Sequence, residues 1–363
     1  MATESSQEEY CNRAKEVKEF DDSKIGVKGL VDSGIITIPR FFIHPPENLT
    51  GIRSHHPEAI QIPTIDLSDH NSIPARSHIV QQIRDAASQF GFFHIVNHGI
   101  PVSIMDATIS AVKAFHELGT EEKKSHYDRS GEGGVYYATN YDLFISRVAT
   151  WRDTLEVQTA PVPPDWKRVP AICQSELMEW SRQTKSLGEV LAELLCQGLR
   201  LQQDRLKELK CMDLRSIVGH CYPHCPQPYL TLGINSHTDP LVLTILLQSE
   251  VEGLQAKIGE DWINIKPMHG ALVVNIGDLL QIMSNGVYKS VEHRVVANSN
   301  KDSRISIAAF LGPTEKEGSR SYGPLPELLS EEKPALYRNF TMEEFMTQFF
   351  SKELCVLVNH FKI

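Results

Sequence analysis

The stretch NSHTDPLVLTILLQ, which starts at Asn235, places a histidine and an aspartate at the beginning of an apolar run. His237 and Asp239 are two residues apart, so in a β-strand both side chains lie on the same face. An unpaired charge is costly to bury, and a metal ion bound by both groups would remove that cost. His293, in the alternating segment YKSVEHRVVAN, supplies a third candidate ligand. Two imidazoles and a carboxylate on one face leave octahedral positions open, which suits the oxygen chemistry of Fe(II).

The pattern His-x-Asp is a weak signal on its own, and the chain contains a second match at His126 and Asp128. This match lies in KKSHYDRSGEGG, which is polar throughout and therefore predicts a solvated loop. We expect no metal site there.

An anion site is expected near the predicted metal ligands. The apolar segment SRISIAAF puts Arg304 and Ser306 on one face of a strand. A guanidinium forms two hydrogen bonds with a carboxylate, and no acidic side chain follows Arg304 within this strand. The carboxylate of a ligand is therefore a candidate partner. Tyr222, in HCYPHCPQP, could add a hydroxyl group to the same anion.

The surrounding sequence changes character along the chain. Residues 1–60 predict an arm that lies on the main body, because 21–34 is polar and punctuated by glycine and three prolines follow. Residues 61–205 combine predicted strands, such as QIPTIDLS and FFHIVNHGIP, with helices at 79–90, 104–115 and 175–201. Residues 206–313 contain short apolar runs between turn residues, which favours a β-sandwich or barrel. Residues 314–363 are polar again and end with a predicted helix at 342–350.

Composition limits the class of protein. The 363 residues carry a formal net charge of −10, which argues against nucleic acid or an anionic membrane as a partner. The polar, acidic start predicts no targeting signal, and no apolar run is long enough to cross a membrane. Seven scattered cysteines suit reduced thiols. We therefore expect a cytoplasmic protein. A monomeric state is expected as well.

Several motifs together resemble those of the plant Fe(II)- and 2-oxoglutarate-dependent dioxygenases. YPHCPQP, WINIKP, GALVVNIGDLLQIMSN and KSVEHRV are similar to the signatures of their catalytic core. IPTIDLS and GFFHIVNHGIP are similar to their N-terminal domain. FDDSKIGVKGLVDSGI, TNYDLF and WRDTLE resemble the 1-aminocyclopropane-1-carboxylate oxidase homologues. That subfamily includes desacetoxyvindoline 4-hydroxylase and other hydroxylases or demethylases of specialised metabolites.

The resemblance implies a mainly β fold with α-helices, in which a double-stranded β-helix, or distorted jelly roll, is flanked by helices. It implies that His237, Asp239 and His293 bind Fe(II). Arg304, Ser306 and Tyr222 would bind 2-oxoglutarate, with O2 consumed, succinate and CO2 released, and ascorbate as reductant. The family places substrate-pocket walls at four further positions, which are Tyr141, Phe144, Val218 and Phe310. His220 departs from related flavonoid enzymes, which carry asparagine two residues before the tyrosine.

The leading reaction is hydroxylation of a small specialised plant metabolite of the alkaloid, flavonoid or terpenoid/steroid type. The alternative is oxidative O-demethylation of a methoxylated metabolite such as a methoxyflavone, because hydroxylating a methyl ether gives a hemiacetal that loses formaldehyde. Three weaker alternatives are true 1-aminocyclopropane-1-carboxylate oxidase activity, a binding protein without catalysis, and structural zinc at HCYPHC. The last lacks the usual paired-cysteine spacing.

Overall fold

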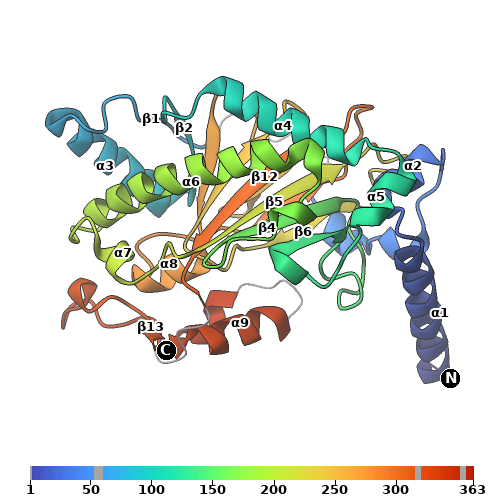
Figure 1. Ribbon diagram of the computed structural model, residues 1–363. Helices are drawn as coiled ribbons and strands as arrows, with labels where there is room; N and C mark the ends of the chain where they lie inside the picture. The colour runs from blue at the N-terminus through green and yellow to red at the C-terminus, as the bar shows by residue number, and fades with distance from the viewer. Residues whose placement is uncertain (1, 53–59, 315–319, 352–356) are drawn as a thin grey trace.

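Two β-sheets face each other at the centre of the computed structural model, which describes residues 2–52, 60–314, 320–351 and 357–363 (Figure 1). The larger sheet contains, in spatial order, β1 (Thr64–Asp66), β2 (Phe92–Val96), β10 (Leu272–Ile276), β7 (Leu243–Gln248), β12 (Arg304–Gly312), β5 (Leu214–Tyr222), β4 (Asp153–Ala160) and β3 (Val135–Thr139). The smaller sheet contains β6 (Leu232–His237), β11 (His293–Val296), β8 (Leu254–Ile258) and β9 (Asp261–Asn264). Residues of both sheets share one apolar cluster between them, including Tyr222 and Val273 from the larger sheet and Leu254 and Val295 from the smaller.

Three long helices cover the outer face of the larger sheet (Figure 1). They are α3 (Ile73–Gln89), α4 (Val102–His116) and α6 (Ala171–Gly198). The main apolar core lies between these helices and every second residue of the strands, such as Ile217 in β5 and Ile305 and Ile307 in β12. The alternate residues of the same strands face the smaller sheet. This arrangement confirms the predicted jelly roll flanked by helices.

Shorter elements complete the chain. The remaining helices are α1 (Ala2–Ser23), α2 (Gly26–Asp32), α5 (Thr120–His126), α7 (Arg205–Glu208), α8 (Asp278–Met283) and α9 (Met342–Ser351). Single 3-10 turns are η1 (Arg40–Phe42), η2 (Pro46–Leu49), η3 (Glu132–Gly134), η4 (Trp166–Arg168), η5 (Pro326–Leu328) and η6 (Leu357–Phe361). A small sheet pairs β13 (Ser321–Tyr322) with β14 (Phe340–Thr341). Within the described ranges, no helix combines the length and apolar character that a membrane crossing requires.

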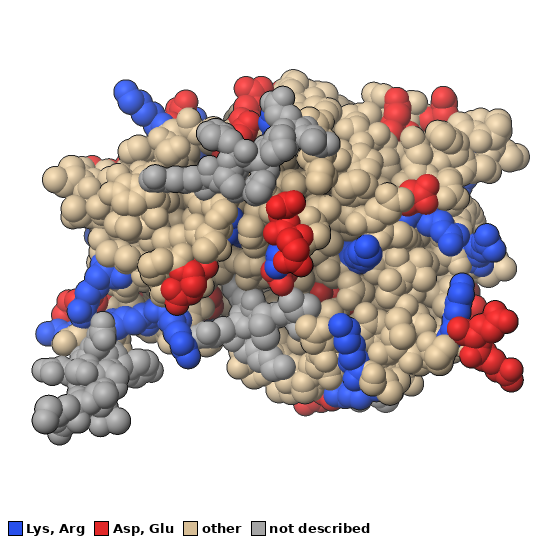
Figure 2. Space-filling view, turned by 180° about the vertical axis from the view of Figure 1, so that it is seen from behind, with Lys and Arg blue, Asp and Glu red and all other residues tan. Residues whose placement is uncertain are grey.

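Charged side chains are dispersed over the face opposite the view of Figure 1. Figure 2 shows Lys and Arg in small separate groups there, with acidic side chains and wide uncharged areas between them. A nucleic-acid surface requires a continuous basic stripe or patch. The described side chains on this face do not form one.

A buried carboxylate holds the N-terminal arm against the main body. The amides of Val27 and Lys28, at the start of α2, each donate a hydrogen bond of 2.8 Å to Asp153, which is fully buried in β4. Thr139 in β3 donates to the same carboxylate at 2.5 Å. Gly26 has a φ of +67°, and a Cβ there would lie 2.7 Å from both oxygens of Asp153. A larger residue at position 26 would have to displace the carboxylate of Asp153, so glycine permits the arm to dock closely on β4.

The prediction of a solvated loop around His126 was wrong. His126 ends the helix α5, and the neighbouring Lys123 is only 1% exposed, donating to the carbonyl oxygen of His116 at 2.9 Å. Arg129 forms an ion pair of 2.7 Å with Asp21 of α1. The sequence pattern failed here because the docked arm covers polar groups that would otherwise face water.

We expect Gly26→Ala to lower the free energy of unfolding by about 2–4 kcal/mol, because it adds a steric clash to the strain of a positive φ. Gly34→Ala is the matched control, since Gly34 has a φ of +80° but nothing within 4 Å of its Cβ position. The control should lose only about 1–2 kcal/mol. Urea unfolding measures both values. Equal losses would show that the contact with Asp153 does not hold the arm.

Candidate functional site

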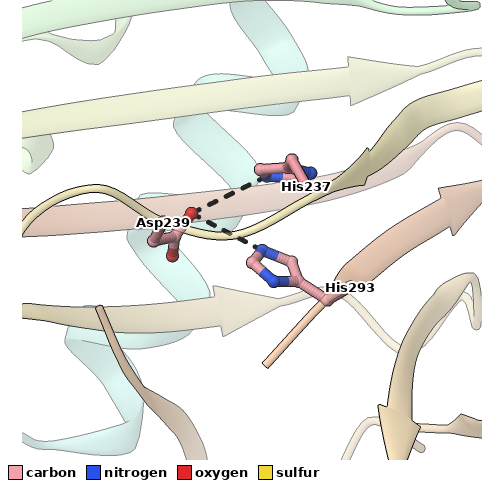
Figure 3. A group of neighbouring side chains, drawn as sticks. All are labelled: His237, Asp239 and His293. Carbon is pink, nitrogen blue, oxygen red and sulfur yellow. Dashed lines mark ion pairs between the residues drawn. The ribbon is translucent and has the colours of Figure 1, made fainter. Parts of the chain in front are cut away.

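The structure brings His237, Asp239 and His293 together between the two sheets (Figure 3). His237 ends β6, His293 begins β11, and these two residues are direct cross-strand partners. Their ring centroids lie 4.2 Å apart. Asp239 Oδ1 lies 3.7 Å from Nε2 of His237 and 3.5 Å from Nε2 of His293. Across the described residues, this is the one group of three metal-ligating side chains close enough to hold a single ion.

Backbone carbonyl groups fix the orientation of both imidazole rings. Nδ1 of His237 lies 2.8 Å from the carbonyl oxygen of Asn235, and Nδ1 of His293 lies 3.1 Å from that of Val291. Because Nδ1–H donates to a carbonyl in each case, the neutral form of each ring carries its lone pair on Nε2, which faces Asp239. Both rings therefore present a metal-binding atom to the same point.

Two strands of the larger sheet hold the carboxylate of Asp239. Thr244 Oγ1, in β7, donates to Asp239 Oδ2 at 2.5 Å, and Asn275 Nδ2, in β10, donates to the same oxygen at 2.7 Å. Oδ1 remains directed at the two histidines. One oxygen thus orients the side chain while the other is placed for a metal, so the donor set fits one divalent ion.

The three side chains of the triad, together with their burial, shift one another's pKa values. Burial, reinforced by His293, lowers the pKa of His237 to about 4. Burial alone would raise the pKa of Asp239, but the two histidines and the bond from Thr244 hold it below its usual range. Burial lowers the pKa of His293, but the charge and hydrogen bond of Asp239 outweigh burial, so the pKa of His293 is raised. The carboxylate and one neutral imidazole are thus available as ligands at neutral pH.

At Gly277 the backbone passes very close to the carbonyl group of Leu241. A Cβ on Gly277 would lie 2.0 Å from the carbonyl oxygen of Leu241. The next residue, Asp278, donates its amide to the carbonyl oxygen of Asp239 at 2.7 Å, and its carboxylate accepts from Thr238 at 2.9 Å. Burial raises the pKa of Asp278 to about 7. The turn from β10 into α8 therefore fixes the segment that carries Asp239.

Sequence reasoning missed these supporting groups. Thr244, Asn275 and Asp278 lie in LVLTILLQ and ALVVNIGDLL, two apolar segments interrupted by single polar residues. An isolated polar residue in a buried strand needs a partner, and that was the signal available.

Arg304 lies on the inner face of the larger sheet with most of its donors free. It is 1% exposed, and its Nη2 donates a hydrogen bond to Gln248 Oε1 at 2.8 Å. Nε and Nη1 of Arg304 and the hydroxyl of Tyr222 are buried without a partner in the described residues. The guanidinium carbon lies 4.9 Å from the ring centre of Tyr222, its cross-strand partner. Unsatisfied buried donors of this kind fit the carboxylate of a ligand.

The register of β5 and β12 shows which other predicted residues share this face. Tyr222 pairs with Arg304, His220 with Ser306, Val218 with Ala308, and Ser216 with Phe310. The structure thus places Ser306, Val218 and Phe310 on the same face as Arg304. Tyr141 and Phe144 lie elsewhere, in the turn after β3, and are 57% and 52% exposed. Tyr141 packs near Tyr136 and Phe350, and Phe144 lies under the guanidinium of Arg129.

The HCYPHC segment does not converge on one point. His220 and Cys221 lie on opposite faces of β5, and Nδ1 of His220 bonds to Thr154 Oγ1 at 3.0 Å. Nδ1 of His224 lies 3.1 Å from the carbonyl oxygen of Asn300. His220 and Cys221 therefore cannot share an ion.

Comparison with known proteins identifies relatives of this chain. A family model described as the 2OG-Fe(II) oxygenase superfamily matches residues 210–313, and one described as the non-haem dioxygenase in morphine synthesis N-terminal matches residues 62–176. The chain is 45% identical to 1-aminocyclopropane-1-carboxylate oxidase homolog 4 of Arabidopsis thaliana, over 98% of this chain and 100% of that protein. It is 42% identical to deacetoxyvindoline 4-hydroxylase of Catharanthus roseus, over 93% of this chain and 86% of that protein.

A solved structure supports the same relationship. The crystal structure of JOX2 in complex with 2OG, Fe and JA superposes with a TM-score of 0.78 and 28% identity, covering 93% of this chain and 98% of that chain. The rice dioxygenase for auxin oxidation, at 23% identity and a TM-score of 0.68, shares the fold.

We expect His237→Ala, Asp239→Ala and His293→Ala each to lose bound Fe(II) and turnover while remaining folded, because each removes one of three converging ligands. Metal content after gel filtration and circular dichroism measure the two properties. His126→Ala is the control, since His126 lies at the end of α5, and it should keep its metal. Iron retained by the His237 variant and lost by the His126 variant would refute the assignment.

Proposed function

Since the chain belongs to the 2OG-Fe(II) oxygenase superfamily, we propose that it hydroxylates a small specialised plant metabolite of the alkaloid, flavonoid or terpenoid/steroid type. The enzyme is a 2-oxoglutarate-dependent dioxygenase that uses Fe(II) and 2-oxoglutarate. One observation supports the residue assignments most strongly. A converging His-Asp-His triad and a buried arginine with free donors lie within the same jelly roll.

In this proposal His237, Asp239 and His293 bind the iron. Thr244 and Asn275 hold the carboxylate of Asp239 so that a single oxygen faces the metal. With 2-oxoglutarate bound, Fe(II) supplies the oxidative decarboxylation to succinate and CO2 that is coupled to oxygenation of a C–H bond. The protein's own contribution is to keep both imidazoles in the Nε2-binding tautomer and to enclose the site among apolar residues.

Arg304, Ser306 and Tyr222 bind the distal carboxylate of 2-oxoglutarate in this proposal. The free Nε–H and Nη1–H groups of Arg304 can donate to its oxygens, and the Tyr222 hydroxyl can donate beside them. Ser306 is the next inward residue of the same strand. Because all these donors are buried, binding the carboxylate satisfies groups that otherwise remain without partners.

The substrate is proposed to bind beyond 2-oxoglutarate, against Val218 and Phe310. Both side chains project from the inner face of the larger sheet. Phe310 follows Arg304 in β12, and Val218 precedes Tyr222, the partner of Arg304, in β5. Tyr141 and Phe144 would contact the substrate only near its exposed end, because both are more than half exposed.

Hydroxylation is favoured over oxidative O-demethylation because the C. roseus relative is named as a hydroxylase. Both reactions use the same chemistry, so the demethylase alternative remains the second candidate. A cytoplasmic location is also proposed, supported by five buried free thiols at Cys173, Cys196, Cys211, Cys221 and Cys225. A monomeric state is part of the same proposal.

The experiment that tests this function is incubation of the enzyme with a plant metabolite extract, Fe(II), 2-oxoglutarate and ascorbate. A product that gains one oxygen supports hydroxylation, and one that loses a methylene supports O-demethylation. Turnover of 1-aminocyclopropane-1-carboxylate with ascorbate and without 2-oxoglutarate would instead support true oxidase activity.

We expect Arg304→Lys to raise the KM for 2-oxoglutarate roughly ten- to a hundredfold, since lysine keeps the charge but loses the planar pair of donors. Arg215→Lys is a control at the far end of β5, opposite Leu311. It should leave this KM unchanged. Succinate formation at varied 2-oxoglutarate concentration measures both constants, and an unchanged KM in the Arg304 variant would remove this residue from the role.

We further expect Phe310→Ala and Tyr141→Ala to weaken substrate binding and to release more succinate per product, because a poorly held substrate offers no well-placed C–H bond. The effect should be larger for Phe310, which lies on the inner face. Binding of Fe(II) and 2-oxoglutarate should remain normal. A wild-type ratio of succinate to product in both variants, with unchanged substrate affinity, would exclude both residues from the substrate site.

A further inference from the structure

Glu156 in β4 is an acidic residue on the inner face of the larger sheet. In the register of the sheet it lies opposite Val218 of β5 and opposite Tyr136 of β3. Val218 in turn lies opposite Ala308 of β12. The side chains of Glu156, Val218 and Ala308 therefore form one row across three strands, on the same face as Arg304 and Phe310.

The side chain of Glu156 is largely surrounded by protein but keeps some solvent-accessible surface. Burial raises its pKa, and the hydrogen bond donated by Ser216 Oγ at 2.6 Å partly opposes this. The side chain nevertheless keeps accessible surface, unlike its neighbours Leu155 and Val157 on the outer face. A group that is desolvated by the protein yet still accessible thus lies on the same face of the larger sheet as Val218 and Phe310, against which the substrate is proposed to bind.

The nearby arginines form their hydrogen bonds with groups other than Glu156, although Nε of Arg152 is buried without a partner in the described part of the chain. Arg129 donates to the Tyr136 hydroxyl at 3.1 Å but forms its ion pair with Asp21. Arg152, on the same face of the β4 segment, donates to Thr150 Oγ1 and to the carbonyl oxygen of Gly233. Among the residues that the structure describes, no Lys or Arg forms an ion pair with Glu156, and its carboxylate accepts a hydrogen bond from Ser216.

We propose that Glu156 is a specificity residue that binds a protonated amine of the substrate, with Ser216 orienting its carboxylate. A buried carboxylate is stabilised by a cation that also donates hydrogen bonds, which an ammonium group does and a neutral hydroxyl does not. The aromatic ring of Tyr136, directly opposite on β3, adds a surface that attracts such a cation. This inference rests on the proposed function and selects, among its substrate types, metabolites that carry a basic nitrogen.

Glu156 lies well apart from the strand that supports the iron ligand Asp239. Thr244, which holds the iron ligand Asp239, is in β7, and β12 and β5 separate it from β4. Adjacent strands are about 4.8 Å apart, so Glu156 lies roughly 14 Å along the sheet from β7.

Small molecules that share a skeleton but differ in charge test whether the site prefers an ammonium group. One set is tryptamine, tryptophol and 3-ethylindole, and the other is phenethylamine, 2-phenylethanol and ethylbenzene, so that each skeleton carries an ammonium, a hydroxyl or neither. Equilibrium dialysis under nitrogen, with enzyme loaded with Fe(II) and 2-oxoglutarate, gives the dissociation constants. We expect the wild type to bind an amine at least about tenfold more tightly than its alcohol counterpart.

Glu156→Gln should abolish this preference, because it keeps the shape and hydrogen-bonding capacity but removes the charge. Glu121→Gln makes the same change in charge on α5, at a side chain that is 87% exposed, and should leave the preference intact. Thermal unfolding checks that both variants are folded. The inference is overturned if the wild type binds amine and alcohol equally, or if it shows no detectable amine binding. It is also overturned if Glu156→Gln keeps the preference for the amine.

A separate readout distinguishes this inference from the proposed function. Formation of succinate from 2-oxoglutarate without substrate should continue in the wild type and in Glu156→Gln, because Glu156 is not part of the iron or 2-oxoglutarate sites. If succinate forms but amines are not preferred, the inference on Glu156 fails while the dioxygenase function stands. Loss of succinate formation in the wild type would contradict the proposed function itself.

Discussion

The carboxylate of Asp239 is the group on which the architecture of the site depends. Its Oδ2 accepts hydrogen bonds from Thr244 and Asn275 of the larger sheet, while its Oδ1 faces His237 and His293 of the smaller sheet. A buried anion needs compensation from both sides, and here each sheet supplies part of it. The distance between the sheets and the position of the metal ligands are therefore coupled through one side chain.

In the strands of the larger sheet, the residues that pack in the apolar core alternate with the residues that face the proposed ligand sites. In β12, Ile305 and Ile307 pack under the helices, whereas Arg304, Ser306 and Phe310 face the smaller sheet. The outer residues join a continuous apolar core, so substitutions there affect folding. The inner residues include buried polar groups without partners among the described residues, so they are placed to contact ligands.

Much of this organisation follows from sequence, for identifiable reasons. The long periodic segments that became α3, α4 and α6 were predicted because their apolar spacing is unambiguous. His237, Asp239 and His293 were recognisable because they interrupt apolar strands, and the same holds, in retrospect, for Thr244 and Asn275. Lys123 and Arg129 were misjudged because their partners belong to an arm about a hundred residues earlier in the chain. The boundaries of the four predicted segments stay a prediction.

The inner face of the larger sheet carries opposite charges at separate positions. Arg304 lies opposite Tyr222, and burial together with the charges of Arg152 and Arg304 holds the pKa of His220 well below its usual value, so that His220 is neutral there. Glu156 lies further along β4, beyond the Thr154–His220 hydrogen bond. A dianionic cosubstrate is attracted to the first region and repelled from the second, and a cationic substrate behaves in the opposite way. In the proposed function, this arrangement of charges would favour 2-oxoglutarate near Arg304 and a cationic substrate near Glu156.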